Sequence, residues 1–378
     1  MVFATNIFFY GTCTVVCNHQ FYNFCKNVGS MRFIKIFFLL SMVVALQPAH
    51  AQQPVQLLDS AHKTSLRGLS VVNDSVFWAS GSNGMVARST DGGKHIQWIQ
   101  VPGFEKRDFR DIEALNDKIA VIMAVAEPAV LLQTTDGGSS WTKVFEDTAK
   151  GMFLDAMAFS PDGRRGFVIG DPLQNNRPYL AATEDGGYSW FKVNTIADKQ
   201  LPLLSTGEAF FASSGTNLCF MQQKLVFVTG GIKSRIVLYN NLRNDSLPIM
   251  QGQTSTGANS IASAASGNYA VVVGGDFAKD TIAHDNCVLV KLTGKGFSFN
   301  KPVTSPHGYR SCVIFTGKHS LVTCGTSGVD VSGDDGSNWQ LLTRQGFHVV
   351  QQARNGHRVY FAGSNGRIAV MNAGYTDK

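Results

Sequence analysis

The stretch TTDGGSSW at Thr134–Trp141 is one of several acidic, glycine-rich turns closed by a tryptophan. TEDGGYSW follows at Thr183–Trp190 and SGDDGSNW at Ser332–Trp339, and a longer version, STDGGKHIQW, begins at Ser89. Short runs rich in Val, Ile, Phe and Ala lie between these turns, roughly 40–55 residues apart, which is the spacing of four-stranded propeller blades. No stretch combines a helical period with helix caps. The repeat therefore predicts an all-β chain.

Seven apolar runs, each preceded by another strand-like run, predict seven blades. We label the first run of a pair strand A and the apolar run strand B; strand C then leads into the acidic turn and strand D leaves it. The apolar B runs are VFWASG, IAVIMAV, GFVIGD, LVFVTGG, YAVVVGGD, SLVTCG and VYFAG. The last repeat stops before a fourth strand, which VQLLD at Val55–Asp59 can supply. We expect a seven-bladed β-propeller closed by this N-terminal strand, with six or eight blades as alternatives.

The acidic turns are expected to be structural clips between strands C and D. Their aspartates accept hydrogen bonds from turn amides, their glycines adopt positive φ, and their tryptophans pack between blades. The residues assigned to this role are Asp91, Asp136, Trp141, Asp185, Trp190, Asp334 and Trp339. A calcium site needs more oxygen ligands than each turn offers. Two repeats lack the turn (YNNLRNDS and KLTGKGFS), which also favours a structural role.

The N-terminal residues have the features of an export signal. Residues 31–51 contain a basic start, an apolar run and an A-x-A cleavage site, and the run is too short to favour a membrane span. Residues 1–30 are interpreted as a mis-annotated upstream extension, with either Met1 or Met31 as the true start. Residues 52–378 form the single propeller domain. We expect a monomer exported to the periplasm or secreted, without a transmembrane segment.

Charge and cysteine usage restrict the possible partners and metals. The net charge of +6 falls to +3 without residues 1–51, because Lys26, Arg32 and Lys35 are lost and no acidic residue is. This balance implies neither nucleic acid nor a polybasic membrane contact. The remaining thiols, Cys219, Cys287, Cys312 and Cys324, show no C-x-x-C spacing, so no metal is expected. Two of them, Cys312 and Cys324, lie opposite each other on consecutive strands and are either a disulfide or two free thiols.

Polar residues gather where A strands begin and where B strands end. In a propeller these positions share one face, around the mouth of the central channel and opposite the acidic turns. Arginines and carboxylates that converge on a concave mouth favour a ligand site. The candidate ligand-binding residues are Arg67, Arg110, Asp111, Asp155, Asp171, Glu208, Arg235, Asp276, Tyr309, Arg310 and His348.

The ordered phrases of the chain resemble a known family. The acidic turn is similar to the Asp-box, or BNR repeat, of sialidase-like propellers. From Leu66 to Asn372, the phrases FRDIEAL, AEPAVLLQTTDGGSSW, FLDAMAF, IGDP, GEAFFASSGT and GTSGVDVS resemble the secreted photosystem II stability/assembly-factor-like propellers. This resemblance implies seven blades and partner binding through an arginine-rich patch. Some relatives are called glycosyl hydrolases or oxidoreductases, but no nucleotide, haem or flavin signature appears here.

Two functions follow from these residues, and neither requires a cofactor. The first is a non-catalytic binding or assembly module that holds acidic groups of a protein or glycan by the arginines Arg67, Arg110, Arg235 and Arg310. The alternative is a sialidase-like glycoside hydrolase, in which Arg67, Arg110 and Arg310 clamp a substrate carboxylate. Its catalytic residues would be Tyr309 as nucleophile, Glu208 as base and Asp155 or Asp171 as acid. The R-I-P phrase of sialidase domains is missing.

Overall fold

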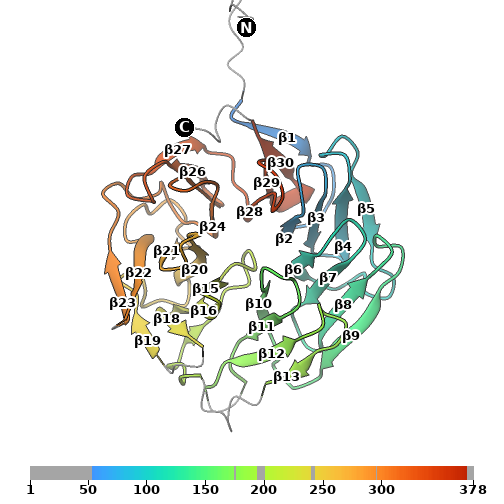
Figure 1. Ribbon diagram of the computed structural model, residues 1–378, viewed down its shortest axis with the longest axis horizontal. Coiled ribbons are helices and arrows are strands. Elements are labelled where there is room, and N and C mark those ends of the chain that lie inside the picture. The colour runs from blue at the N-terminus through green and yellow to red at the C-terminus, as the bar shows by residue number, and fades with distance from the viewer. Residues whose placement is uncertain (1–52, 174–175, 194–200, 240–242, 295, 373–378) are drawn as a thin grey trace, which may run out of the picture. The chain divides into compact units, whose positions relative to one another are not determined.

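The computed structural model describes residues 53–173, 176–193, 201–239, 243–294 and 296–372. These residues form seven four-stranded antiparallel blades arranged in a ring (Figure 1). This confirms the expected seven-bladed all-β propeller and excludes the six- and eight-bladed alternatives. The proposed signal segment and upstream extension lie outside the described residues.

The strands of each blade follow one another from the channel outward. Blades 1 and 2 consist of β2 (Leu66–Val71), β3 (Phe77–Gly81), β4 (Met85–Ser89), β5 (Gln97–Gln100), and of β6 (Phe109–Ala114), β7 (Ala120–Ala124), β8 (Ala129–Thr134), β9 (Thr142–Asp147). Blade 3 consists of β10 (Leu154–Phe159), β11 (Gly166–Gly170), β12 (Tyr179–Thr183) and β13 (Phe191–Lys192), and blade 4 of β15 (Leu218–Met221), β16 (Lys224–Val228), β18 (Arg235–Leu238) and β19 (Arg243–Ser246).

The remaining blades complete the ring. Blade 5 consists of β20 (Thr256–Ser263), β21 (Tyr269–Asp276), β22 (Cys287–Thr293) and β23 (Gly296–Asn300), and blade 6 of β24 (Cys312–Phe315), β25 (Leu321–Gly325), β26 (Gly328–Ser332) and β27 (Gln340–Thr343). Blade 7 consists of β28 (Val349–Gln352), β29 (Val359–Ala362), β30 (Ile368–Met371) and β1 (Val55–Asp59), with the 3₁₀ turn η1 (Ser364–Gly366) before β30. Two short strands, β14 (Glu208–Ala209) and β17 (Gly230–Gly231), extend the sheet of blade 5.

Burial explains why the second strand of each blade is so apolar. Strands β3 and β7 are buried along their whole length, because both of their faces pack against neighbouring blades. The outer strands β5 and β9 alternate between half-buried and exposed residues. A strand covered on both faces is expected to be a continuous apolar run, whereas an edge strand carries polar residues.

The N-terminal strand closes the ring, as expected. In the β1–β30 pair, Val55 lies opposite Met371 and Gln56 opposite Val370. The side chain of Trp98 in blade 1 donates a hydrogen bond of 3.0 Å to Asp59 at the end of β1. Strand β1 therefore contacts both the last blade and the first.

Each acidic turn is held by the same set of hydrogen bonds. In blade 2, one carboxylate oxygen of Asp136 accepts the backbone N–H of Ser140 at 2.9 Å, and the other accepts its hydroxyl at 2.6 Å. The hydroxyl of Thr134 donates to the same aspartate and accepts the N–H of Gly138. These hydrogen bonds hold the pKa of Asp136 down at about 2. Equivalent bonds form around Asp91, Asp185 and Asp334.

The clips also set the distance between blades. A Cβ added to Gly138 would lie 2.6 Å from Ile99 of the preceding blade, and Trp141 meets Trp78 of that blade edge-on at 6.5 Å. Backbone N–H groups of the clips donate to the turns between strands A and B, as Gly137 does to Lys118. The clips and the A–B turns therefore share one face of the propeller, which we call the Asp-box face.

The four cysteines among the described residues are free thiols. Cys312 of β24 lies directly opposite Cys324 of β25, and both are buried. Of the two possibilities left open by the sequence, the structure therefore contains the unbridged pair.

We expect that removing β1 will destabilise the propeller and make it self-associate. A chain that begins at Ser60 leaves the edge of β30 unpaired and Trp98 without its acceptor. Calorimetry should show a Tm lower by about 5–10 °C, and sedimentation should show oligomers formed through the free strand edge. A chain that begins at Gln52 keeps β1 and is the control. Equal Tm values and a monomeric shortened chain would contradict the closure.

Candidate functional site

Three arginines from different blades meet on the face opposite the Asp-boxes. Arg67 begins β2 and Arg110 begins β6, while Arg367 lies between η1 and β30. Burial lowers the pKa of Arg67, and repulsion from the charge of Arg110 lowers it further. We call Arg67, Arg110 and Arg367 the arginine cluster, and their side of the molecule the arginine face.

The cluster has little acidic compensation. Arg67 donates only to the backbone carbonyl of Ser213, at 3.3 Å, among the described residues. Arg110 donates to Asp108 at 2.7 Å and lies over the ring of Phe153. Arg367 donates to a backbone carbonyl at 2.6 Å. Among the described residues, only one of the three guanidinium groups, that of Arg110, is therefore paired directly with a carboxylate, and a cluster with excess positive charge attracts anions.

His348 is a neutral neighbour of the cluster. It is buried, and its ring lies 2.9 Å from the hydroxyl of Ser364. Burial lowers its pKa to about 3, and the charges of Arg67, Arg367 and Arg110 add to the effect. The imidazole therefore stays uncharged at neutral pH and serves as a hydrogen-bonding group beside the arginines.

Two of the expected carboxylates, Asp155 and Asp111, are buried, and a third, Asp171, is half-buried. Asp155 has no exposed surface, and neither of its oxygens has a partner with full hydrogen-bond geometry among the described residues. Burial raises its pKa well above the usual range, and the nearby charge of Asp171 adds to this. Asp171 accepts the N–H of Phe210 at 2.9 Å, and burial raises its pKa too. Asp111 accepts the N–H groups of Ile112 and Met157.

Two buried ion pairs occupy other expected site residues. Glu208 and Arg235 form a bidentate pair with both contacts at 2.8 Å, and the glutamate also accepts the hydroxyl of Thr229 at 2.6 Å. Arg310 is fully buried and pairs with Asp330. A buried charge with a partner is held in place by the large penalty for separating the two. These four side chains therefore join strands and loops, and the structure does not bring Arg310 into the arginine cluster.

Tyr309 is buried in a hydrogen-bonded position rather than presented to solvent. Its hydroxyl donates to Asn259 at 2.8 Å, and burial raises its pKa to about 12. Its ring contacts Phe277, which is 49% exposed and also packs edge-on against Phe211. Asp276, beside Phe277, accepts the N–H of Ala278 at 2.9 Å and so shapes this loop. The arginine face thus includes an aromatic patch formed by Phe211 and Phe277.

A loop before blade 4 crosses the channel and closes it toward the arginine face. We call residues 211–216 the plug. Ser213 accepts from Arg67 of blade 1 and its hydroxyl donates to Asn259 of blade 5 at 2.9 Å. Ser214 donates to a carbonyl before β24 at 2.7 Å. At Gly215, with φ of +68°, a Cβ would lie 2.4 Å from the carboxyl group of Asp111 in blade 2.

Sequence reasoning missed Arg367, the aromatic patch and the plug. Arg367 lies in the last repeat after GSNG, where the first repeat has Met85 instead, so a comparison of the repeats signals a difference. Phe277 has no motif that separates it from ordinary loop residues, and the sequence SSGT, although part of a phrase shared with the family, does not indicate that this loop crosses the channel. Within the described ranges, no group of three or more His, Cys, Asp or Glu side chains is arranged to hold a metal. No helix there has the length and hydropathy of a membrane span.

Comparison with known proteins supports the resemblance noted from the sequence. The photosystem II assembly lipoprotein Ycf48 of Synechococcus sp. (strain CC9902) is 27% identical over 150 residues. This match covers 38% of the chain and only 41% of the length of that relative. No protein-family model matches.

Two solved structures have the same fold. The structure of YCF48 bound to D1 peptide superimposes with a TM-score of 0.58 at 14% identity, covering 86% of this chain and 96% of that one. YCF48 from Cyanidioschyzon merolae superimposes with a TM-score of 0.57 at 14% identity, covering 84% of this chain and 99% of that one. The likeness to Ycf48-type propellers is thereby confirmed, and at this identity the two structures establish the fold alone.

We expect Asp155→Asn to stabilise the protein at neutral pH. The pKa of Asp155 is raised in the folded state, so ionisation of this carboxyl group destabilises the fold. The destabilisation is absent below the pKa of the unfolded state, about 3.8, and grows as pH rises above it. The Tm difference between variant and wild type should therefore increase from pH 3.5 toward pH 7. Thermal unfolding monitored by circular dichroism across this range provides the measurement, and a variant destabilised at pH 7 would refute the reasoning.

A double-mutant cycle tests the structural role of the Glu208–Arg235 pair. Glu208→Gln leaves a buried guanidinium without its counter-charge and should lower the free energy of unfolding by about 3–5 kcal/mol. Adding Arg235→Gln should recover part of this loss, because no unpaired charge remains. Urea unfolding of the single and double variants measures the coupling. Additive losses would show that the two side chains act independently.

Proposed function

We propose that this protein is an exported, non-catalytic binding module whose arginine face holds an acidic segment of a partner protein. The observation that carries the proposal is the arginine cluster, in which one guanidinium group is paired with a carboxylate and the other two contact only backbone carbonyls among the described residues. Guanidinium binds carboxylates with two parallel hydrogen bonds, so the cluster suits a partner's aspartate, glutamate or terminal carboxylate.

The position of the cluster favours recognition over structural use. Other arginines of the chain have buried carboxylate partners, as Arg235 and Arg310 do. Within the described ranges, Arg67 has a single hydrogen bond, to a backbone carbonyl, and its pKa is lowered by burial and by Arg110. An incoming carboxylate would relieve this repulsion, and the gain in a half-buried site is larger than at an open surface. The neutral His348 adds a hydrogen-bonding group without adding charge.

The aromatic patch favours a protein over a glycan as the partner. Phe277 is 49% exposed, and the nearby loops add Ile232 at 46% and Leu203 at 53%. Protein interfaces are enriched in aromatic residues and arginine, which contribute much of the binding energy at their centres. An acidic segment with an apolar residue beside its carboxylate fits both parts of the face.

The similar proteins are consistent with this assignment. One YCF48 structure holds a D1 peptide, so a propeller of this fold accepts a peptide ligand. The Synechococcus relative is a lipoprotein, which agrees with export of this chain by the signal of residues 31–51 to the periplasm or beyond. For this chain, the proposal rests on the arginine cluster.

The geometry gives little support to a hydrolase. Glu208, the expected base, accepts four hydrogen bonds, two of them from Arg235. Tyr309 is buried with a raised pKa, and Arg310 is bound to Asp330 away from the cluster. A sialidase-like mechanism needs these groups at one substrate, with an acid beside them.

The proposal is tested with fluorescent peptides that differ only in charge. One peptide carries aspartate and glutamate beside an apolar residue, and its partner carries asparagine and glutamine at the same positions. Anisotropy should show binding of the acidic peptide that weakens with salt. The triple variant Arg67→Gln, Arg110→Gln, Arg367→Gln should lose at least about tenfold in affinity, equivalent to about 1.4 kcal/mol.

A matched triple variant on the other face is the control. Lys118, Arg164 and Lys318 are exposed in A–B turns of the Asp-box face, and their replacement by glutamine removes the same charge. This variant should bind the acidic peptide as the wild type does. Equal losses of peptide affinity in both triple variants would show that binding depends on net charge alone and would overturn the proposal. Preference for sialylated glycans over acidic peptides would overturn the choice of partner.

A further inference from the structure

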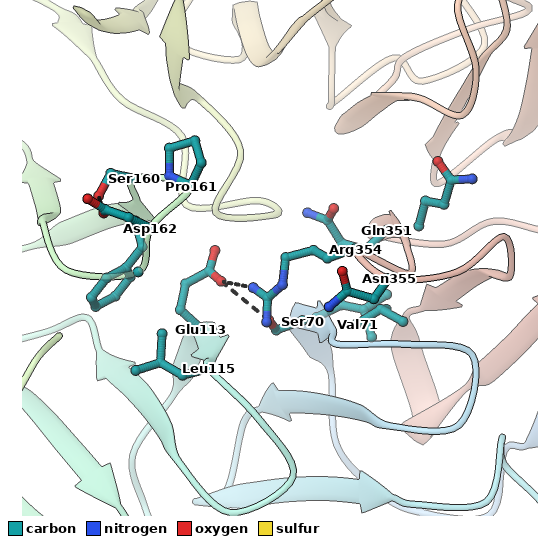
Figure 2. Close-up of a pocket in the computed structure, with 14 residues that line it drawn as sticks. Ser70, Val71, Glu113, Leu115, Ser160, Pro161, Asp162, Gln351, Arg354 and Asn355 are labelled. Carbon is teal, nitrogen blue, oxygen red and sulfur yellow. Dashed lines mark hydrogen bonds and ion pairs between the residues drawn. The ribbon is translucent and has the colours of Figure 1, made fainter. Parts of the chain in front are cut away.

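A second possible site lies at the opposite mouth of the channel, on the Asp-box face. A cavity of about 650 Å³ opens there between the ends of β2, β6, β10 and β28 (Figure 2). A second cavity of about 410 Å³ shares Glu113 and Arg354 with it and is lined further in by residues 214–216 of the plug. Together they form a recess closed toward the arginine face. Volumes in this range are typical of small-molecule sites.

The wall of this recess contains a carboxylate with unused hydrogen-bonding capacity. One oxygen of Glu113 accepts the hydroxyl of Ser70 at 3.3 Å and lies 3.5 Å from Arg354 (Figure 2). Charge-assisted hydrogen bonds are normally 2.7–2.9 Å long, so both contacts are loose. The other oxygen has no partner among the described residues. Each carboxylate oxygen offers about two acceptor positions, so the second oxygen of Glu113 can accept hydrogen bonds from a ligand.

Side-chain amides line the same recess. The side-chain amide of Gln351 has no hydrogen-bond partner within the described part of the chain. The side chain of Gln352 donates to the carbonyl of Thr316 at 3.2 Å, which leaves its oxygen open. Asn355 lies at the rim, and its side chain is likewise unpaired among the described residues. An amide both donates and accepts, so this wall can satisfy a ligand with several hydroxyl groups.

Charge and surface character narrow the ligand class. Arg354 offsets the charge of Glu113, and Asp162 adds a negative charge at the rim. Asp162 therefore disfavours an anionic ligand, and the guanidinium group of Arg354 disfavours a cationic one. Apolar residues line the recess as well, and we call them the apolar strip: Leu115, Phe159 and Pro161, together with Leu69 and Val71, which have little exposed surface. We propose that this recess binds a neutral polyhydroxylated ligand of mono- or disaccharide size, with C–H faces on the strip and hydroxyls on Glu113 and the amides.

Calorimetric titration with neutral sugars tests the proposal. The panel consists of glucose, galactose, mannose, N-acetylglucosamine, maltose and cellobiose, each titrated into the purified full chain. At least one should bind saturably with Kd of about 1 mM or tighter, or about −4 kcal/mol. Glu113→Gln keeps the shape of the side chain and removes its charge, and it should weaken binding about tenfold. Gln351→Ala removes an unpaired amide and should weaken binding without disturbing an internal contact.

Two controls show whether a loss of sugar affinity comes from the recess itself, from altered folding or from the arginine face. Gln97→Ala makes the same change as Gln351→Ala on the outer strand β5 and should leave sugar affinity unchanged, with all variants close to wild type in Tm. The arginine triple variant should also keep its sugar affinity. No saturable binding by any sugar at about 10 mM, or binding unchanged by both Glu113→Gln and Gln351→Ala, would overturn the proposal.

Discussion

The ring depends on the pairing of the first described strand with the last. Strand β1 supplies the outer strand of blade 7, and its end holds Trp98 of blade 1 through Asp59. The contact joins residues more than 300 positions apart, so its loop-closure entropy is large and it completes a topology dominated by non-local contacts. Once formed, it leaves no long unpaired sheet edge between first and last blade.

Charge is used in two different ways in this molecule. Buried pairs such as Glu208–Arg235 and Arg310–Asp330 fix loops and strand ends, and each loses much stability when one partner is removed. Arg67 and Arg110 instead face each other at the channel mouth, where burial and repulsion together lower the pKa of Arg67. A protein retains such an arrangement only when the rest of the fold stabilises it. A buried carboxylate partner therefore distinguishes the structural arginines from the arginines that are available to a binding partner.

The fold could be predicted because its signals are local and repeated. The acidic turn, the alternating apolar runs and the incomplete last repeat each have a direct structural meaning, and together they give the blade number and the closure. The site was harder to predict. Arg67 and Arg310 occupy equivalent positions at the start of inner strands, yet only Arg310 meets a buried carboxylate, Asp330, from its own blade. Which arginine finds a partner depends on packing across strands, and no local pattern contains that information. The plug is likewise defined by contacts with four blades.

The plug turns a tunnel into two separate compartments. Residues 211–216 are hydrogen-bonded to blades 1 and 5 and to the carbonyl before β24, and residues 214–216 line the inner end of the recess. The lining of the recess includes Arg354 but none of the three residues of the arginine cluster. Two occupants would therefore bind with independent affinities while the plug keeps its position. The two binding affinities would become thermodynamically linked only if this loop moved. Gly215 packs against Asp111, so a displacement at this position would couple the two sites.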